Sequence, residues 1–532
     1  MESSPKGFGQ DGSQPSELNK ILGILKLSSN TSNIINGVTY KKFYPFYKDI
    51  EPFLVKTKRT ILKDVIALVS TQDKSVIEYY DELNNSSTNK QDLSRLLSKA
   101  NWTTYKKNIK DFIDNIIKNN IDLSPNRVDL THITAYTIDP ENSKDRDDAL
   151  SIKILNNYYI VYIHIADPTS YFDENNILDR ELRERCSSIY LKDKVHHMMP
   201  EEFAENIIAL NNNKSRAFTC ETIFDKNYKR LDYKFYKSFI NPINLTYEEA
   251  DKFLDKNKDI KNLYEFGKHL NLGFNKNYDI HEMVAQYMIL CNYLVGLFLK
   301  DDISISRYNN SIIANNIDEN KITKLTLENE VYELLTLKSD VYELLTNQLK
   351  YKRAEYSVDN HGHSILGLEY YQHFTSPIRR YADLVVHRIL SNKLGLINYN
   401  IDKNKLIKLC SKLNTVNNLY KLSYQIDNIY DKIKNFNQIL NGKIVNIDDA
   451  YINIYLDSLD LILYFNLINH KIKELYDIMI KDNKLIIIDK HNNVFELSLY
   501  QEVKFKIYDN ILSRNIFTIE LLNPNIKDFF II

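Results

Sequence analysis

Four aspartates fall within ten positions of one short segment, and this clustering constrains the chain more than any other feature. They are Asp139, Asp145, Asp147 and Asp148. Two carboxylates about 4 Å apart repel each other by roughly 4 kcal/mol at an effective dielectric constant of about 20. A fold that gathers such groups therefore needs a hard cation between them. Mg²⁺ takes oxygen ligands and keeps positions open for phosphate and water, so the segment predicts a divalent-metal site for phosphoryl chemistry.

Two other interpretations of this acidic segment are a solvated surface loop and a calcium site. An EF-hand loop places its aspartates at alternating positions around a central glycine and ends in a glutamate. The segment from Asp139 to Asp148 contains no glycine, and Pro140 follows its first aspartate. The calcium loop is thus disfavoured, while the solvated loop stays open.

A second unusual segment, HFTSPIRRYADL, lies much later in the chain. Thr375 or Ser376 can cap a helix, and Pro377 suits its first turn. Free N–H groups and a positive dipole end make such a helix start an anchor for phosphate. Arg379 and Arg380 would oppose that dipole unless an anion compensates, so the segment predicts a phosphate contact.

On a continuous helix Asp383 and His387 would share one face with Arg379, because they follow it at four-residue intervals. The alternative is an ordinary helix in which the arginine forms a structural salt bridge.

Size and charge set wider limits. With 532 residues the chain is long enough for about two to four domains. Its 69 Lys+Arg and 70 Asp+Glu nearly cancel, so any RNA-binding surface must be a local basic groove. Four dispersed cysteines without a CxxC pair indicate a reducing compartment, and we expect a cytoplasmic location.

No membrane segment is expected. The N-terminus lacks the apolar stretch of a signal peptide. The most apolar window, residues 284–299, is interrupted by Gln286 and Asn292 and is too short to span a bilayer. We predict a buried helix there.

Hydrophobic periodicity divides the rest of the chain. A strand is predicted at 133–138, running into the aspartate segment, and a hairpin at 149–155 and 158–165, where Asn156 and Asn157 would accept the positive φ of a tight turn. A strand is also predicted at 61–69 and a helix at 90–119. Mainly helices are predicted at 247–433, a region that contains the six residues VYELLT twice, at 331–336 and 341–346. From 441 onward the short strands are typical of a small barrel.

Several motifs occur in a fixed order: the aspartate segment, then IHIADP at 163–168, SIYL at 188–191, MPEE at 199–202, and the HFTSPIRRYADL segment. Together they resemble the ribonuclease II/R (RNB) family, which includes the catalytic subunit of the eukaryotic exosome. The resemblance spans residues 131–433, and separate motifs in order are far more specific than one short pattern.

The resemblance implies an α+β multidomain fold. A disordered tail at 1–20 would precede a divergent N-terminal domain at 21–127, a reduced cold-shock/OB remnant. An RNB catalytic domain would follow at 128–436, in which a sheet flanked by helices forms an RNA channel. A C-terminal OB-fold β-barrel at 437–532 would bind RNA.

The activity implied is processive, Mg²⁺-dependent 3′→5′ hydrolysis of single-stranded RNA to nucleoside 5′-monophosphates, with Mn²⁺ as a substitute. The protein would act as a monomer or within an RNA-decay assembly. The metal ligands implied are Asp139, Asp145, Asp147 and Asp148. Hydrolysis would depend most on Asp147, Arg379 would grip the scissile phosphate, and the RNA contacts would include Tyr190, Thr375, Ser376 and Arg380.

Departures from the family leave alternatives open. Cys186 stands where a glycine is common, Tyr420 and Lys421 where a glutamate is usual, and Tyr190 could be a core residue. One competing function is a catalytically silent RNA-binding relative, and another is a phosphohydrolase of small nucleotides. All four aspartates and Arg379 are present, which favours the enzyme over the silent relative.

Overall fold

The computed structural model describes most of the chain between residues 20 and 524. The described residues are 20–27, 33–35, 38–45, 52–58, 64–80, 105, 107–119, 121–124, 126–191, 195–211, 214–270, 272, 278–309, 354–433, 438–448, 451–459, 461–466, 476–509 and 517–524. They belong to two compact units, one of residues 1–100 and 511–516, the other of residues 101–510 and 517–532. The predicted domain boundaries stay a prediction.

The first unit is built on an antiparallel sheet. Its strands are β1 (Lys20–Leu25), β2 (Asn33–Ile35), β3 (Val38–Pro45), β4 (Phe53–Lys56), β5 (Val65–Ser70) and β6 (Val76–Tyr80), in the order β2-β3-β1-β5-β6 with β4 paired to β3. β1 pairs with β5 from Ile21 opposite Val69 to Leu25 opposite Val65, and these side chains are buried. The strand predicted at 61–69 is confirmed as β5, while residues 61–63 lie outside the described part.

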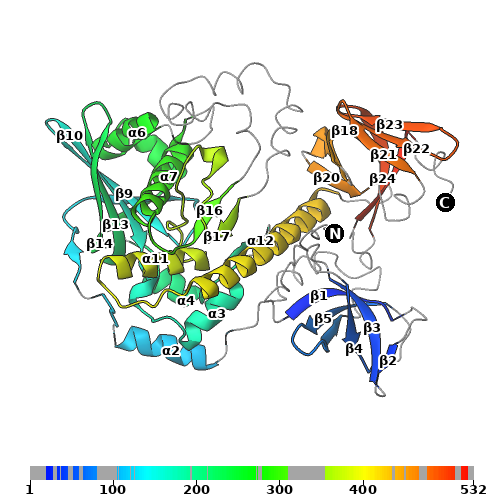
Figure 1. Cartoon of the computed structure of the whole chain (residues 1–532). Helices are drawn as coiled ribbons and strands as arrows, with labels where there is room; N and C mark the ends of the chain where they lie inside the picture. The colour runs from blue at the N-terminus through cyan, green and yellow to red at the C-terminus, as the bar shows by residue number, and fades with distance from the viewer. Residues whose placement is uncertain are drawn as a thin grey trace, which may run out of the picture. The chain divides into compact units, whose positions relative to one another are not determined.

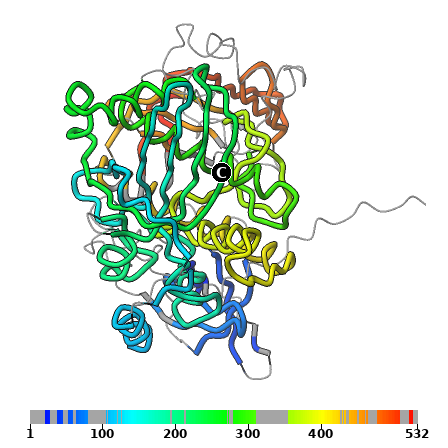
Figure 2. The backbone as a smooth tube through the Cα atoms, turned by 90° about the vertical axis from the view of Figure 1, so that its left-hand side faces the viewer, coloured from blue at the N-terminus to red at the C-terminus, as the bar shows by residue number. Residues whose placement is uncertain are grey.

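A seven-stranded sheet is the centre of the second unit. Its strands are β7 (Val128–Asp129), β8 (Ala135–Asp139), β9 (Asp148–Leu155), β10 (Tyr158–Ala166), β13 (Ser215–Asp225), β14 (Arg230–Ile240) and β15 (Pro242–Thr246), in the order β15-β8-β9-β10-β13-β14-β7. Figure 2 shows the cyan and green strands of this sheet running side by side. The predicted strand before the aspartates and the β9–β10 hairpin are confirmed. The predicted positive φ at Asn156 and Asn157 is wrong, because neither is among the described non-glycine residues with positive φ.

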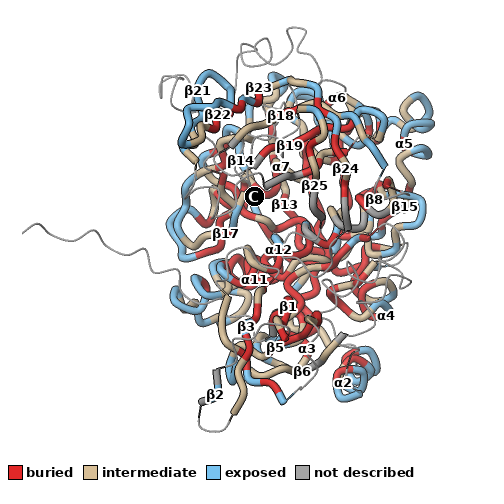
Figure 3. Tube along the Cα trace, turned by 90° about the vertical axis from the view of Figure 1, so that its right-hand side faces the viewer, coloured by how far each residue is buried: buried red, intermediate tan, exposed pale blue. Residues whose placement is uncertain are grey.

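This unit also contains helices. They are α2 (Lys107–Lys118), α3 (Ile177–Arg185), α4 (Glu201–Phe203), α5 (Tyr247–Phe253), α6 (Lys258–Leu270), α7 (Ile280–Phe298), α11 (Tyr381–Lys393) and α12 (Lys403–Lys432). Of these, α5, α6 and α7 pack on the sheet (Figure 1). Figure 3 shows that much of the chain around α7 and β13 is buried. The ring of Phe266 in α6 meets Phe224 of β13 with centroids 4.9 Å apart, and Phe298 in α7 meets Phe235 of β14 at 5.4 Å. These contacts seal the apolar face of the sheet.

The prediction of mainly helices at 247–433 is confirmed in part, because α5, α6, α7, α11 and α12 lie there together with two short strands among the described residues. α7 confirms the buried helix, and no described helix is long and apolar enough to cross a membrane. α2 confirms the second half of the helix predicted at 90–119, whereas residues 90–104 and both VYELLT copies lie outside the described residues.

Two short pairs of antiparallel strands also belong to this unit: β11 (Ile189–Tyr190) with β12 (Val195–His196), and β16 (Ser306–Tyr308) with β17 (Glu355–Ser357).

The C-terminal region forms two antiparallel sheets that share one core. One contains β18 (Ile439–Asp448), β19 (Tyr451–Leu456), β20 (Leu461–Asn466), β24 (Glu502–Asp509) and β25 (Phe517–Asn523), and the other β21 (Asp477–Lys481), β22 (Lys484–Ile488) and β23 (Val494–Ser498). Buried Ile454, Leu485 and Phe505 belong to that core together with Ile429 of α12. The predicted α+β fold with a C-terminal set of strands is confirmed, while closure into a barrel stays a prediction.

Candidate active site

The sheet holds the aspartate segment between two neighbouring strands. β8 ends at Asp139 and β9 begins at Asp148, so the intervening loop is fixed at both ends. Inside the loop the carbonyl of Asp147 accepts a hydrogen bond from the N–H of Ala166, 2.8 Å away. Asp139 and Asp148 therefore lie in the sheet itself and Asp147 is buried beside it, which excludes a freely solvated loop.

Asp147 joins the two segments that the sequence singled out. Its side chain is buried, and Oδ1 accepts a hydrogen bond from the backbone N–H of Ile378 at 2.8 Å, across 231 positions of sequence. Its Oδ2 lies 3.5 Å from Nε of Arg379. Burial raises the pKa of Asp147 well above its usual value, while Arg379 and the Ile378 N–H act in the opposite direction.

Arg379 presents its charge to the solvent side of the site. Its side chain is 42% exposed, and Asp147 is its one ion-pair partner among the described residues. Its carbonyl accepts a hydrogen bond from the N–H of Ser188, which fixes the backbone. The outward guanidinium can thus receive an anion such as phosphate.

Asp139 and Asp148 form a pair with raised affinity for protons. Burial raises the pKa of Asp139 to about 6, with Arg146 opposing and Asp145 adding to the rise. Burial and the Asp139 charge raise the pKa of Asp148 to about 7. Both shifts mean that the ionised carboxylates are disfavoured in this buried place, and a bound cation would stabilise them.

The donor set fits a hard divalent cation. The Oδ2 atoms of Asp139 and Asp147 are buried without a hydrogen-bond partner in the described structure. Within the same residues, no three His, Cys, Asp or Glu side chains converge into a complete metal cage. Mg²⁺ does not need one, since it keeps several waters and takes one or two carboxylates plus substrate phosphate.

Asp145 connects the aspartate loop to the β11–β12 hairpin. The hydroxyl of Tyr190 donates to its Oδ2 at 3.1 Å, and Nδ1 of His197 lies 3.9 Å from the same oxygen. The Tyr190 side chain is 44% exposed, which excludes a core position. Its ring is accessible, and its hydroxyl is held by the Asp145 carboxylate. His197 is not among the residues predicted from the sequence, although the histidine pair before MMPEE was a visible signal.

The predicted helix start at Thr375 or Ser376 is wrong. Helix α11 begins at Tyr381, and the preceding residues form a turn in which the N–H groups of Arg379 and Arg380 donate to the carbonyl of Ser376. The turn forms in place of a helix because the Ser376 N–H donates to Oδ1 of Asp383, 2.8 Å away.

Arg380 forms the structural salt bridge that was the alternative for this segment. Its Nε and Nη2 lie 2.9 and 2.7 Å from the two oxygens of buried Asp383. His387 is turned to the carbonyl of Phe374 instead of sharing a face with Arg379. Thr375 and Ser376 are each 3% exposed, and their assignment as RNA contacts, like that of Arg380, stays a prediction.

Buried ion pairs brace the site. Asp167 of the IHIADP motif lies 2.6 Å from Lys237 and 2.8 Å from Arg127, and against the effect of burial they hold its pKa well below the usual range. Asp179 pairs with Arg388 at 2.8 Å and so joins α3 to α11. These roles come from tertiary contacts that a sequence pattern does not contain.

Comparison with known proteins identifies the family of the central region. Residues 127–272 and 260–395 match the RNB domain. Ribonuclease R of Chlamydia trachomatis is 28% identical over 339 residues, covering 54% of this chain and 49% of that protein. The exosome complex exonuclease RRP44 of Mus musculus is 30% identical over 353 residues, covering 54% of this chain and 37% of that protein. The chain thus spans about half the length of the first curated relatives it matches.

Solved structures share the fold. Mycoplasma genitalium RNase R in complex with ribose methylated single-stranded RNA has a TM-score of 0.64 at 19% identity, covering 94% of this chain and 90% of that one. Yeast Ssd1, a pseudonuclease, also reaches 0.64, at 13% identity, covering 96% of this chain and 84% of that one. At these identities the likeness concerns the fold alone.

Proposed function

Because the chain belongs to the RNB domain family, we propose that it is a metal-dependent exoribonuclease that degrades single-stranded RNA from the 3′ end to nucleoside 5′-monophosphates. The observation that carries the proposal is the contact between the two segments of interest. Asp147 accepts the N–H of Ile378 and lies beside Arg379, so an acidic loop and a cationic turn face the same point.

Arg379 would bind the scissile phosphate. Its side chain is 42% exposed, so its guanidinium can offer N–H donors to the charge that spreads over the phosphoryl oxygens during hydrolysis. Asp147 holds the Nε edge of that guanidinium and so orients it. Water adds to phosphorus, the bond to the upstream 3′ oxygen breaks, and that oxygen takes up a proton.

Asp139, Asp145 and Asp148, together with Asp147, would hold the cation. When bound, the cation would lower the pKa of the attacking water and stabilise the leaving oxygen. Mg²⁺, or Mn²⁺ in its place, suits the oxygen donors.

Tyr190 would stack on a base near the cleaved linkage. Its exposed ring and anchored hydroxyl give a fixed platform, and stacking of this kind does not discriminate sequence. RNA as substrate is supported by the structural relative that holds single-stranded RNA. Processive action, a monomeric state or membership of an RNA-decay assembly belong to the same proposal.

A silent RNA-binding protein is the second candidate, favoured by one observation. The pseudonuclease structure is as similar in fold as the ribonuclease complex, so the fold does not separate the two functions. The aspartates and Arg379, with the pKa shifts of Asp139 and Asp148, support the enzyme.

Asp147→Asn tests this choice. The change keeps the shape and the acceptor for Ile378 but removes the charge beside Arg379. We expect the cleavage rate of a labelled oligoribonucleotide to fall at least about 100-fold, with its affinity in a filter-binding assay unchanged within about twofold.

The exposed Asp173→Asn is the matched control and should leave both quantities unchanged. If Asp147→Asn retains full cleavage, the aspartate site is not catalytic. If binding is lost as well, the role of Asp147 is structural.

A further inference from the structure

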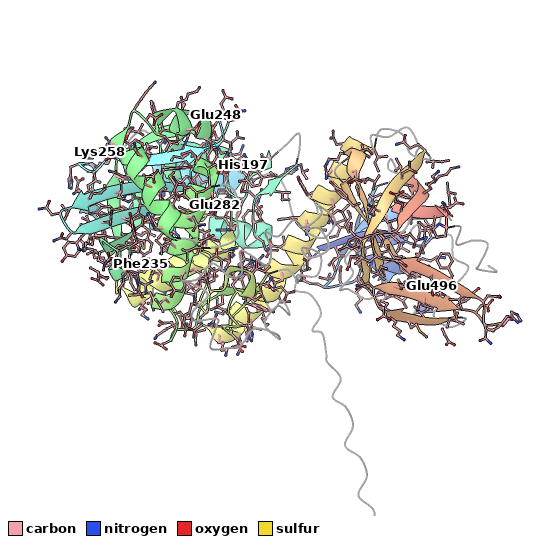
Figure 4. All side chains as sticks on the ribbon, turned by 90° about the horizontal axis from the view of Figure 1, so that it is seen from above. His197, Phe235, Glu248, Lys258, Glu282 and Glu496 are labelled. Carbon is pink, nitrogen blue, oxygen red and sulfur yellow. The ribbon has the colours of Figure 1, made fainter. Side chains whose placement is uncertain are left out.

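His197 lies at the edge of the aspartate site and has no role in the function proposed above. It follows strand β12, and its side chain is 22% exposed (labelled in Figure 4). Its Nδ1 is buried and has no hydrogen-bond partner in the described structure. A buried, unsatisfied imidazole nitrogen is costly unless something binds it.

A carboxylate oxygen of Asp145 lies near Nδ1 of His197. Nδ1 of His197 is 3.9 Å from Oδ2 of Asp145, too far for a hydrogen bond. Two ligands that each bind one cation at about 2.1 Å lie at most about 4.2 Å apart. The separation therefore allows one ion to contact both atoms.

Tyr190 supports this arrangement because it binds the same carboxylate oxygen. Its hydroxyl donates to the same Oδ2 of Asp145, which fixes that carboxylate and leaves its remaining lone pair for an ion. The Asp145 oxygen is thus held in place at the point that His197 faces.

We infer that His197 is a ligand of the divalent cation together with Asp145, and that it biases the site towards Mn²⁺ and related transition ions over Mg²⁺. The inference rests on the proposed metal-dependent function. Imidazole is a nitrogen donor that transition ions accept readily, whereas Mg²⁺ prefers oxygen throughout. One nitrogen in an otherwise carboxylate set shifts preference without abolishing Mg²⁺ binding.

Pulsed electron paramagnetic resonance tests the ligand directly. The full chain is loaded with one equivalent of Mn²⁺, and electron spin echo modulation reports any ¹⁴N bound to the ion. We expect a ¹⁴N signal from the unmodified chain, its loss in His197→Gln, and its retention in the exposed control His132→Gln.

Affinity supplies the second measurement. By titration calorimetry His197→Gln should weaken Mn²⁺ binding at least about tenfold, with Mg²⁺ binding changed less than about twofold. Thermal unfolding of each metal-free variant shows whether the substitution alters folding.

The inference is overturned if Mn²⁺ binds without a ¹⁴N signal, or if the signal and the affinity persist in His197→Gln. In either case His197 is only an ion-pair partner of Asp145, and the proposed nuclease function stands. If the unmodified chain binds no divalent ion and cleaves no RNA, the proposed function fails as well.

Discussion

The half-buried carboxyl group of Asp148 carries a pH dependence with a defined sign. Its pKa is about 7 in the folded chain and 3.8 as the ordinary value, because burial and Asp139 disfavour the charge. The folded state therefore holds a proton that the unfolded state releases, and the stability of the metal-free protein should fall as pH rises from about 4 to about 7.

Asp148→Asn should remove its own share of this dependence, while Asp139 and Asp147, whose pKa values are also raised by burial, keep the rest. At pH 8 without metal we expect the unfolding free energy of the variant to exceed that of the unmodified chain by about 2 kcal/mol. This is less than the full pKa shift of Asp148 implies, because the carboxyl group is partly exposed. Added Mg²⁺ should stabilise the unmodified chain but not the variant. Urea unfolding at a series of pH values measures both, and a flat profile in the unmodified chain would contradict the account.

Cys186 stores backbone strain beside the site. It ends helix α3 with φ 64° and ψ −45°, a conformation that suits glycine, and its carbonyl accepts the N–H of Tyr381. Such strain costs about 1–3 kcal/mol.

Glycine at this position should therefore be tolerated better than alanine. We expect Cys186→Gly to be more stable than Cys186→Ala by about 1 kcal/mol, since both lose the thiol and only alanine keeps the strain. Thermal unfolding of the two variants makes the comparison. Equal stability would mean that the backbone relaxes.

The turn before α11 is the element that places Arg379, and Asp383 holds it. Asp383 accepts the Ser376 N–H and pairs with Arg380 while fully buried. Asp383→Asn would keep an acceptor but leave Arg380 uncompensated, so we expect a loss of about 3 kcal/mol in unfolding free energy.

Cleavage should also slow, because Arg379 would lose its fixed position. The control Asp359→Asn removes an exposed pair with Lys403 and should cost less than about 1 kcal/mol. Chemical denaturation and RNA cleavage measure the two effects. Similar losses in both variants would refute the role given to the turn.

Elements with a clear local pattern could be predicted from the sequence. The two strand-like runs on either side of Asn156 and Asn157 predicted the β9–β10 hairpin, and a long apolar run predicted α7. The start of α11 was mispredicted, because Asp383 draws the Ser376 N–H into a turn that local capping rules do not include. Most of the N-terminal sheet was also missed, since β1 is defined by its distant partner β5.

For the site, the motifs predicted the aspartates, Arg379 and Tyr190 as candidates. The structure adds how they meet: Asp147 reaches the Ile378 N–H, and Asp145 reaches Tyr190 and His197. Such contacts depend on the packing of strands and turns far apart in sequence, so residue types and spacing alone do not give them.

At the scale of the whole molecule the formal charge of −1 excludes a general attraction for RNA. In the proposed function, specific contacts must therefore supply the affinity for RNA. Those of Arg379 and Tyr190 are the ones on which the proposal mainly rests. The α+β fold agrees with this, since the matched RNB region contains both the aspartate loop and the turn before α11.

The most direct test is the polarity of cleavage of one single-stranded oligoribonucleotide, labelled at its 3′ or its 5′ end, with Mg²⁺ and with a chelator. The account predicts immediate release of 3′ label as a mononucleotide, stepwise shortening of 5′-labelled strands, and neither with chelator. Intact RNA after prolonged incubation with Mg²⁺ or Mn²⁺, or cleavage that persists with chelator, would contradict it.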